Sequence, residues 1–180
     1  NTVMRDCTCE VIVQDAENSN PYSTYSCDDT ALVADRIGGV AAFTDGLLNV
    51  TKAVVEGITV RAFDIAGGIL AEVTENATAD VSVTESSVVE NSDIRVYGSA
   101  NVASVSSLRQ YYNAAGGAVG KIDNLNKLNI ETFNFNGYVG TYSYDNLNKD
   151  CTAGGIIGFV TDKLTTLDAI KIYNSTVSGE

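Results

Sequence analysis

The residues of this chain with the most distinctive chemistry are its four cysteines, Cys7, Cys9, Cys27 and Cys151. An even number in an acidic chain rich in Ser, Thr and Asn favours disulfide bonds formed in an oxidising compartment. Cys7 and Cys9 are too close to form an obvious pair, and in a strand they would share one face. We expect one of them to bond Cys27 and the other Cys151; four buried reduced thiols are the alternative. A zinc site is disfavoured, because the chain has no CxxC motif and no histidine.

Three Asn-x-Ser/Thr triplets form a second group of candidate sites, and they begin at Asn49, Asn76 and Asn174. In a secreted chain each triplet is a candidate acceptor for an N-linked glycan on an exposed turn or strand. Asn76 has the most polar surroundings of the three. Such triplets also arise by chance in a chain rich in Asn and Thr.

Catalysis and metal binding find little support. Without histidine, the usual Ser/His/Asp and Cys/His arrangements are excluded. The adjacent acidic pair Asp28-Asp29 lies in a turn-rich stretch, and no Gly-Gly phrase has the Gly-Lys-Ser/Thr ending of a phosphate loop. The phrase Asp123–Lys127, repeated at Asp145–Lys149, has Leu where a calcium loop needs an oxygen ligand. We therefore expect no enzyme activity, no cofactor and no metal site, with this Leu in the core and Asp and Asn at a corner.

A short glycine phrase that recurs along the chain indicates which elements carry these residues. Two glycines, two apolar residues and then Ala or Gly occur in the segments Ile37–Ala42, Ala66–Ala71, Ala115–Gly120 and Ala153–Gly158. A looser copy is Asn136–Gly140. Paired glycines permit a tight turn, and the small residue lets another stretch of backbone approach closely. Repetition of such a unit predicts a stack in which each turn buries its apolar face on the next.

Alternating apolar and polar phrases predict half-buried strands. They occupy residues 58–63, 94–98, 130–135 and 170–174. Late glycine phrases recur after 137 − 117 = 20 and 155 − 137 = 18 residues, which matches one coil of a β-solenoid. The single proline agrees, because ladder hydrogen bonds need every N–H. Residues 47–56 and 160–170 admit a helix instead, and residues 76–92 read as an insertion between turns.

Domain organisation follows from composition. Residues 1–30 contain three of the four cysteines and the only proline, Pro21. We expect residues 1–30 to form an end cap or a donated strand, and residues 31–180 to form the repeat domain. The expected fold class is all-β, a solenoid-like stack of short strands with a disulfide-tied N-terminal segment.

The charge distribution excludes some partners. The net charge of −12 lies almost entirely in residues 1–90, which carry 15 acidic and 4 basic residues. Nucleic acid or an anionic membrane would be repelled by this half and would find no basic patch in the other. No apolar run approaches the length of a transmembrane helix. A chain that starts with Asn1 fits a processed or internal segment, which says nothing against secretion. From the cysteines and the composition we expect a secreted or cell-surface protein.

The late glycine phrases also resemble a known repeat family. Gly117–Gly120, Gly137–Gly140 and Gly155–Gly158, followed by Ile172–Gly179, resemble GLUG-type repeats of large secreted or surface-anchored, adhesin-like proteins. The resemblance covers residues 110–180 well and residues 31–100 poorly, where Ala42 and Ala71 replace the last glycine. It implies a right-handed β-helix in an extracellular, non-enzymatic module, and it supplies no catalytic residues.

These observations predict a structural protein, the building block of a surface filament that joins end to end or by strand addition. Nothing resembling a polar cap follows the last repeat, and open strand edges invite another chain. One alternative is an adhesin or carbohydrate-binding module that binds glycans or a host surface through stacking tyrosines, notably Tyr142 and Tyr144. The other is a fimbrial β-sandwich subunit that donates its N-terminal strand.

Overall fold

The computed structural model of the chain describes residues 3–5, 36–62, 64–75, 78–96, 113–141, 151–161, 164 and 168–179. These residues form strands and connecting turns, and none of them lies in a helix. Within the same residues, nothing qualifies as a helix that could cross a membrane. The all-β expectation is confirmed for this part of the chain.

The strands form four sheets in which every observed pairing is parallel. The first sheet consists of β2 (Arg36–Gly38), β7 (Ile65–Gly67), β11 (Asn113–Gly116) and β15 (Cys151–Gly154). The second consists of β3 (Ala41–Thr44), β8 (Leu70–Val73), β12 (Val119–Ile122) and β16 (Ile157–Val160). The third consists of β4 (Leu47–Thr51), β9 (Asp80–Thr84), β13 (Lys127–Glu131) and β17 (Ile170–Tyr173). The fourth consists of β1 (Val3–Arg5), β5 (Val54–Glu56), β6 (Thr59–Ala62), β10 (Ser87–Val96), β14 (Asn134–Thr141) and β18 (Thr176–Gly179).

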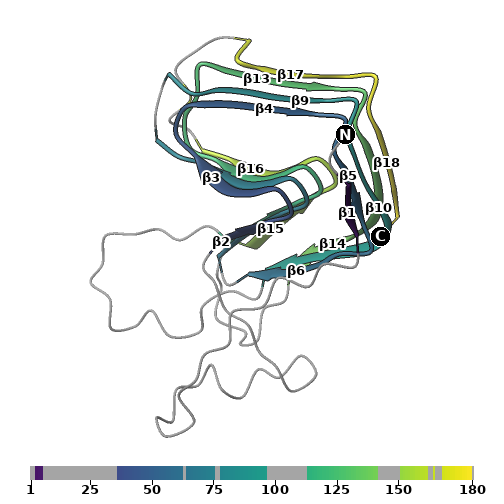
Figure 1. Cartoon of the computed structure of the whole chain (residues 1–180). Helices are drawn as coiled ribbons and strands as arrows, with labels where there is room; N and C mark the ends of the chain where they lie inside the picture. Colours follow the sequence, from purple (N-terminus) through teal and green to yellow (C-terminus); the bar gives the residue numbers. More distant parts are fainter. Residues whose placement is uncertain are drawn as a thin grey trace, which may run out of the picture.

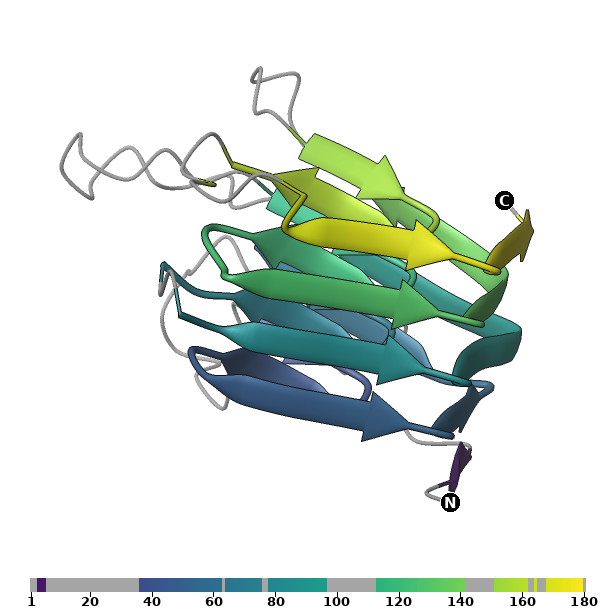
Figure 2. The ribbon, with the colours of Figure 1, turned by 90° about the horizontal axis from the view of Figure 1, so that it is seen from above.

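The chain passes through these sheets in the same order four times, and the passages lie one above another (Figures 1 and 2). We call each passage a circuit: residues 36–62, 65–96, 113–141 and 151–179 form the first to the fourth. Residues that pair between successive circuits form a column along the stack; one column is Leu48, Val81, Leu128 and Ile170. The antiparallel β-sandwich considered above is wrong for the described residues, because all their strand pairs are parallel.

The paired glycines form the turn between the first and second sheets. A Cβ atom on Gly67 would lie 1.9 Å from the carbonyl oxygen of Leu70, in the same turn. A Cβ atom on Gly68 would lie 2.1 Å from the carbonyl oxygen of Gly117, in the next circuit. Any side chain at these positions would collide with backbone. The glycine phrase therefore sets both the tightness of the turn and the close approach of neighbouring circuits.

The corner between the third and fourth sheets has a different solution. Its column consists of Lys52, Glu85, Thr132 and Asn174, all with φ between 48° and 56°. This left-handed conformation is costly for residues other than glycine. Hydrogen bonds to the next circuit offset the cost, since the N–H of Lys52 donates to Thr84 O at 3.0 Å and that of Glu85 to Glu131 O at 2.9 Å. The stack itself therefore holds the corner in shape.

Apolar side chains fill the interior between the sheets. The largest are at most 2% exposed and include Ile69, Leu70, Ile94, Ile122, Leu128, Ile130, Phe133 and Phe135. Leu125 of the repeated pentapeptide is also fully buried, so the expectation that it points into the core is confirmed. Its second copy, Asp145–Lys149, lies outside the described residues.

Several sequence-based expectations about the repeat are wrong. Equivalent residues of the glycine phrase are Ile37, Ala66, Ala115 and Ala153, spaced by 66 − 37 = 29, 115 − 66 = 49 and 153 − 115 = 38 residues. The period near 20 came from Gly137–Gly140, which lies in β14 of the fourth sheet and belongs to no glycine turn. Sheet position, and not similarity of phrase, defines the repeat.

The local expectations need correction too. Residues 47–56 form β4 and β5, so the helical alternative is wrong there. Within residues 160–170, the described ones include no helix. Residues 78–92 are no insertion, because they supply β9 and most of β10, the second circuit's strands in two sheets. The alternating phrases are not equivalent either: residues 94–96 lie in β10 of the fourth sheet, whereas residues 130–135 run from the end of β13 in the third sheet to the start of β14 in the fourth.

Candidate functional site

Exposed apolar side chains gather at the two ends of the stack. Eight large hydrophobic residues among the described ones are exposed, and seven of them lie in the first or the fourth circuit. In the first circuit they are Val40, Phe43 and Leu47. In the fourth circuit they are Val160, Ile172, Tyr173 and Val177. The eighth is Tyr138 in the third circuit.

For Val160, Ile172 and Val177, the cause of this exposure is that no further circuit among the described residues covers them. Phe43, Leu47 and Tyr173 differ, because they pair with the charged residues Glu72, Asp80 and Glu131. Ile172 is 41% exposed, whereas Ile130, its column neighbour in the third circuit, is fully buried. Val177 is 51% exposed, whereas its column neighbour Phe135 is 2% exposed. These side chains therefore continue the interior columns of the core out to the surface of the stack.

The two ends differ in how far the interior is open. In the first circuit, Val50 and Val55 occupy the columns of Ile172 and Val177, yet they are only 6% and 0% exposed. Strand β1 pairs with β5 at this end and adds one strand to the fourth sheet. Figure 2 shows β1 at one end of the stack and β18 at the other. Among the described residues, the fourth circuit is thus the more open end.

Strand β18 also presents unpaired backbone groups. The N–H of Thr176 donates to Phe133 O at 2.9 Å, toward the third circuit. In a parallel ladder the N–H and C=O of successive residues point to opposite sides of a strand. The N–H and C=O of Val177 therefore point to the open edge, away from β14. Such an edge is a template for pairing with another strand.

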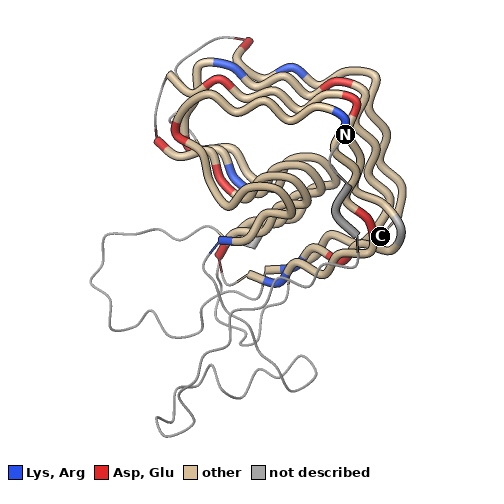
Figure 3. Tube along the Cα trace, in the orientation of Figure 1, with Lys and Arg blue, Asp and Glu red and all other residues tan. Residues whose placement is uncertain are grey.

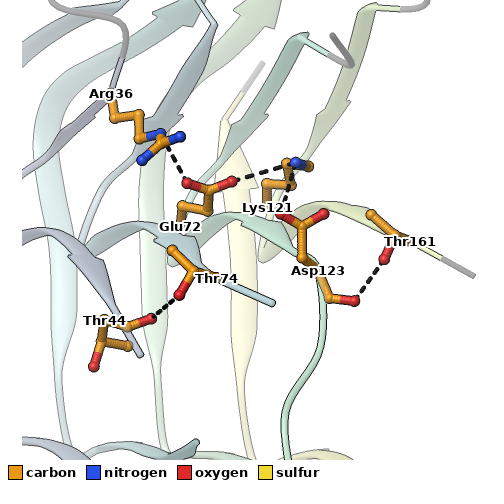
Figure 4. Close-up of polar contacts among 7 residues, drawn as sticks. All are labelled: Arg36, Thr44, Glu72, Thr74, Lys121, Asp123 and Thr161. Carbon is orange, nitrogen blue, oxygen red and sulfur yellow. Dashed lines mark hydrogen bonds and ion pairs between the residues drawn. The ribbon is translucent and has the colours of Figure 1, made fainter. Parts of the chain in front are cut away.

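A buried charge network links three circuits (Figure 4). The Nζ atom of Lys121 lies 3.2 Å from Oε1 of Glu72 and 2.9 Å from Oδ2 of Asp123. The Nε atom of Arg36 lies 2.8 Å from Oε2 of Glu72. The Glu72 side chain is 3% exposed, those of Lys121 and Asp123 are 14% and 10% exposed, and that of Arg36, at the rim of the network, is 41% exposed. Two cations and two carboxylates therefore compensate one another across the first, second and third circuits.

This network joins the circuits, and its charged groups pair with one another. Thr161 of the fourth circuit extends it, because its hydroxyl donates a hydrogen bond to Asp123 O at 2.6 Å. Elsewhere, charged residues of both signs lie around the circuits (Figure 3). The described residues contain no group of three or more His, Cys, Asp or Glu side chains that could hold a metal ion.

The ionisation of Glu72 gives a test of the network. Burial raises the pKa of Glu72 above its ordinary value of 4.5, against the opposing charges of Lys121 and Arg36. A raised pKa in the folded state adds stability below the unfolded pKa, and that stability is lost as the pH rises through the folded value. As the pH rises from 4 to 7, we expect the free energy of unfolding to fall less for the Glu72→Gln variant than for the natural chain. Urea unfolding of both proteins across this range measures the difference, and a steeper loss for the variant would contradict it.

The structure places only some of the sequence-predicted site residues. Cys7, Cys9, Cys27 and Asn76 lie outside the described residues, so the disulfide pairing stays a prediction. The backbone of Cys151 begins β15. Asn49 is exposed in β4, and Asn174 is exposed at the left-handed corner. These two sequons do not lie together in one site.

The adhesin alternative would bind glycans through tyrosines. Tyr142 and Tyr144 lie outside the described residues. Tyr138 and Tyr173 are exposed, and each contacts a charged neighbour of this chain: the Tyr138 ring lies 4.5 Å from the Arg95 guanidinium, and the Tyr173 hydroxyl donates to Glu131 at 2.7 Å. Sequence reasoning missed the charge network, in which Glu72 and Lys121 lie 49 residues apart along the chain.

Comparison with protein-family models, with curated proteins and with solved structures found no match for this chain. The functional argument therefore depends on the geometry of the two ends and on the residues themselves.

Proposed function

We propose that this chain is a β-solenoid, a right-handed β-helix, that serves as a building block of an extracellular filament and associates through the ends of its stack. The observation that carries the proposal is that the large exposed apolar side chains of the described residues lie in the end circuits, with one exception. Each circuit adds one parallel strand to each sheet, and β1 adds one more to the fourth sheet, so a second copy placed on an end would align its sheets with those of the first.

Burial of the exposed interior columns supplies the driving force. Val160 and Ile172 continue columns whose members in the third circuit, Ile122 and Ile130, are fully buried. Removing such side chains from water gains roughly 25 cal/mol per Å² of apolar surface. The interior of a neighbouring copy offers that environment, and flat polar sheet faces do not.

An oxidising, extracellular setting agrees with the residues. Four cysteines, a charged fraction of 19% and many Ser, Thr and Asn residues are typical of secreted β-proteins. The exposure of Asn49 and Asn174 leaves both sequons accessible to a glycan. A disulfide-tied N-terminal segment and a GLUG-like repeat remain part of this proposal.

Two substitutions of similar exposure test the association. Val160 is 38% exposed in the fourth circuit, and Tyr138 is 36% exposed in the third. We expect Val160→Lys to raise the concentration needed for assembly about tenfold, because a charge must be desolvated at the contact, whereas Tyr138→Lys changes it less than about twofold. Light scattering and electron microscopy measure the assembly, and circular dichroism checks that both variants fold.

A natural chain that stays a monodisperse monomer at high concentration, across pH and salt, would overturn the proposal. Equal effects of the two substitutions would show that assembly does not use the end of the stack. Specific glycan binding by a strictly monomeric chain would favour the adhesin alternative instead.

A further inference from the structure

We infer that, in the filament proposed above, the open edge of β18 pairs in parallel with strand β1 of a second copy of this chain. The inference rests on the proposed function and names the contact that it uses. It makes the fourth sheet continuous from one copy to the next.

The order of strands in the fourth sheet sets the geometry. Its order is β1-β5-β10-β14-β18, and all neighbours are parallel. Strands β1 and β18 are therefore the two ends of this order, at opposite ends of the stack (Figure 2), while β6 lies off it and pairs with β10. A copy displaced along the stack brings its β1 strand beside β18 with the same strand direction.

The register of the existing pairs predicts the register of the new one. Met4 pairs with Val55, Val55 with Val88, Val88 with Phe135, and Phe135 with Val177, so one column runs the length of the sheet. At its end Val177 is 51% exposed. Placing Met4 of the second copy opposite Val177 continues this column across the contact.

The backbone groups fit this register. The N–H and C=O of Val177 point to the open edge, as derived above. By the same alternation, Met4 directs its N–H and C=O toward β5, and Val3 and Arg5 direct theirs away from it. In the contact, Val177 N–H donates to the C=O of Val3, and Arg5 N–H donates to the C=O of Val177. The pair thus satisfies backbone groups on both strands that face no other strand among the described residues.

The composition of β18 also favours pairing. Exposed edge strands are usually protected by charges, by proline or by bulges. The β18 sequence Thr176-Val177-Ser178-Gly179 has no charge and no proline, and it pairs with β14 without a bulge. Opposite it, only Arg5 of β1 is charged, so the contact brings no like charges together.

Translation suits this contact better than a two-fold axis. A two-fold axis across the stack would reverse the sense in which the chain of the second copy runs around the stack and reflect the cross-section, so most sheets would not meet their counterparts. Translation preserves both the direction and the outline of the sheets. A repeated head-to-tail contact of this kind does not close, so it propagates a filament.

Photo-crosslinking of the full chain tests the contact. p-Benzoylphenylalanine replaces Ser178, which the register places opposite Arg5 of the second copy. We expect crosslinks between copies that map to residues 3–5. The same probe at Asn136, which pairs with Ser178 one circuit earlier, should give crosslinks within one copy only.

A second variant tests the outward-facing side of β1. Arg5→Pro removes an N–H that points away from β5, and we expect it to raise the assembly concentration about tenfold, while Arg5→Ala changes it less than about twofold. Filaments whose crosslinks map elsewhere, or that tolerate Arg5→Pro, would overturn this inference and leave the filament standing. A chain that never assembles would overturn the proposed function itself.

Discussion

Replacing Gly117 with alanine should lower the free energy of unfolding by about 3 kcal/mol, a large part of the total stability of an ordinary domain. The added Cβ would lie 2.1 Å from the carbonyl oxygen of Gly155 and 2.7 Å from the Phe135 ring. Neither neighbour can retreat freely, because Gly117 N–H also donates to Gly154 O at 3.1 Å and Phe135 is buried. The circuits would have to separate locally. Equilibrium unfolding in urea, followed by circular dichroism, measures the loss.

Gly46 provides the matched control for this substitution. A Cβ atom on Gly46 would meet nothing within 4 Å, and its φ is not positive. Alanine there should leave stability unchanged or raise it by up to about 1 kcal/mol, because it restricts the unfolded chain. Similar losses at both glycines would show that glycine content matters and close approach between circuits does not.

The contrast between these glycines shows how far the sequence predicts the fold. The paired glycines and the small residue that ends the phrase predict a tight turn and a close approach of backbone. Both features are found at Gly67 and Gly68. Nothing in the sequence distinguishes the left-handed corner, where Lys52 and Glu85 adopt positive φ because hydrogen bonds to the next circuit hold them. A conformation imposed by a neighbouring circuit leaves no local signal.

The length of a circuit was hidden for a related reason. Connections between circuits vary, so equivalent glycine phrases are 29, 49 and 38 residues apart by the differences given above. A similar phrase at Gly137 lies in another sheet and produced a false period. The exposed apolar residues at the end of the stack were hidden in the sequence as well. Ile172 and Ile130 lie in similar sequence phrases and differ only in whether a circuit covers them.

Removing the cation at the centre of the charge network should have the second large effect. We expect Lys121→Met to lower the free energy of unfolding by about 3 kcal/mol, because it leaves two buried carboxylates with one cation fewer. Glu72 would keep only Arg36, whereas Asp123 would lose the ion pair that it makes at 2.9 Å. The double variant Glu72→Gln/Lys121→Met should recover part of the loss, since it removes a charge of each sign. Urea unfolding of the three proteins measures both effects.

An exposed ion pair shows whether burial is the cause. Lys52 lies 3.6 Å from Glu85, also between the first and second circuits, but these side chains are 54% and 58% exposed. Lys52→Met should therefore change the free energy of unfolding by no more than about 0.5 kcal/mol. Equal losses in the free energy of unfolding for Lys52→Met and Lys121→Met would show that the network stabilises the chain no more than an exposed ion pair does. A large loss at Lys121 alone would show that the burial of these charges, and not ion pairing as such, makes the network important for stability.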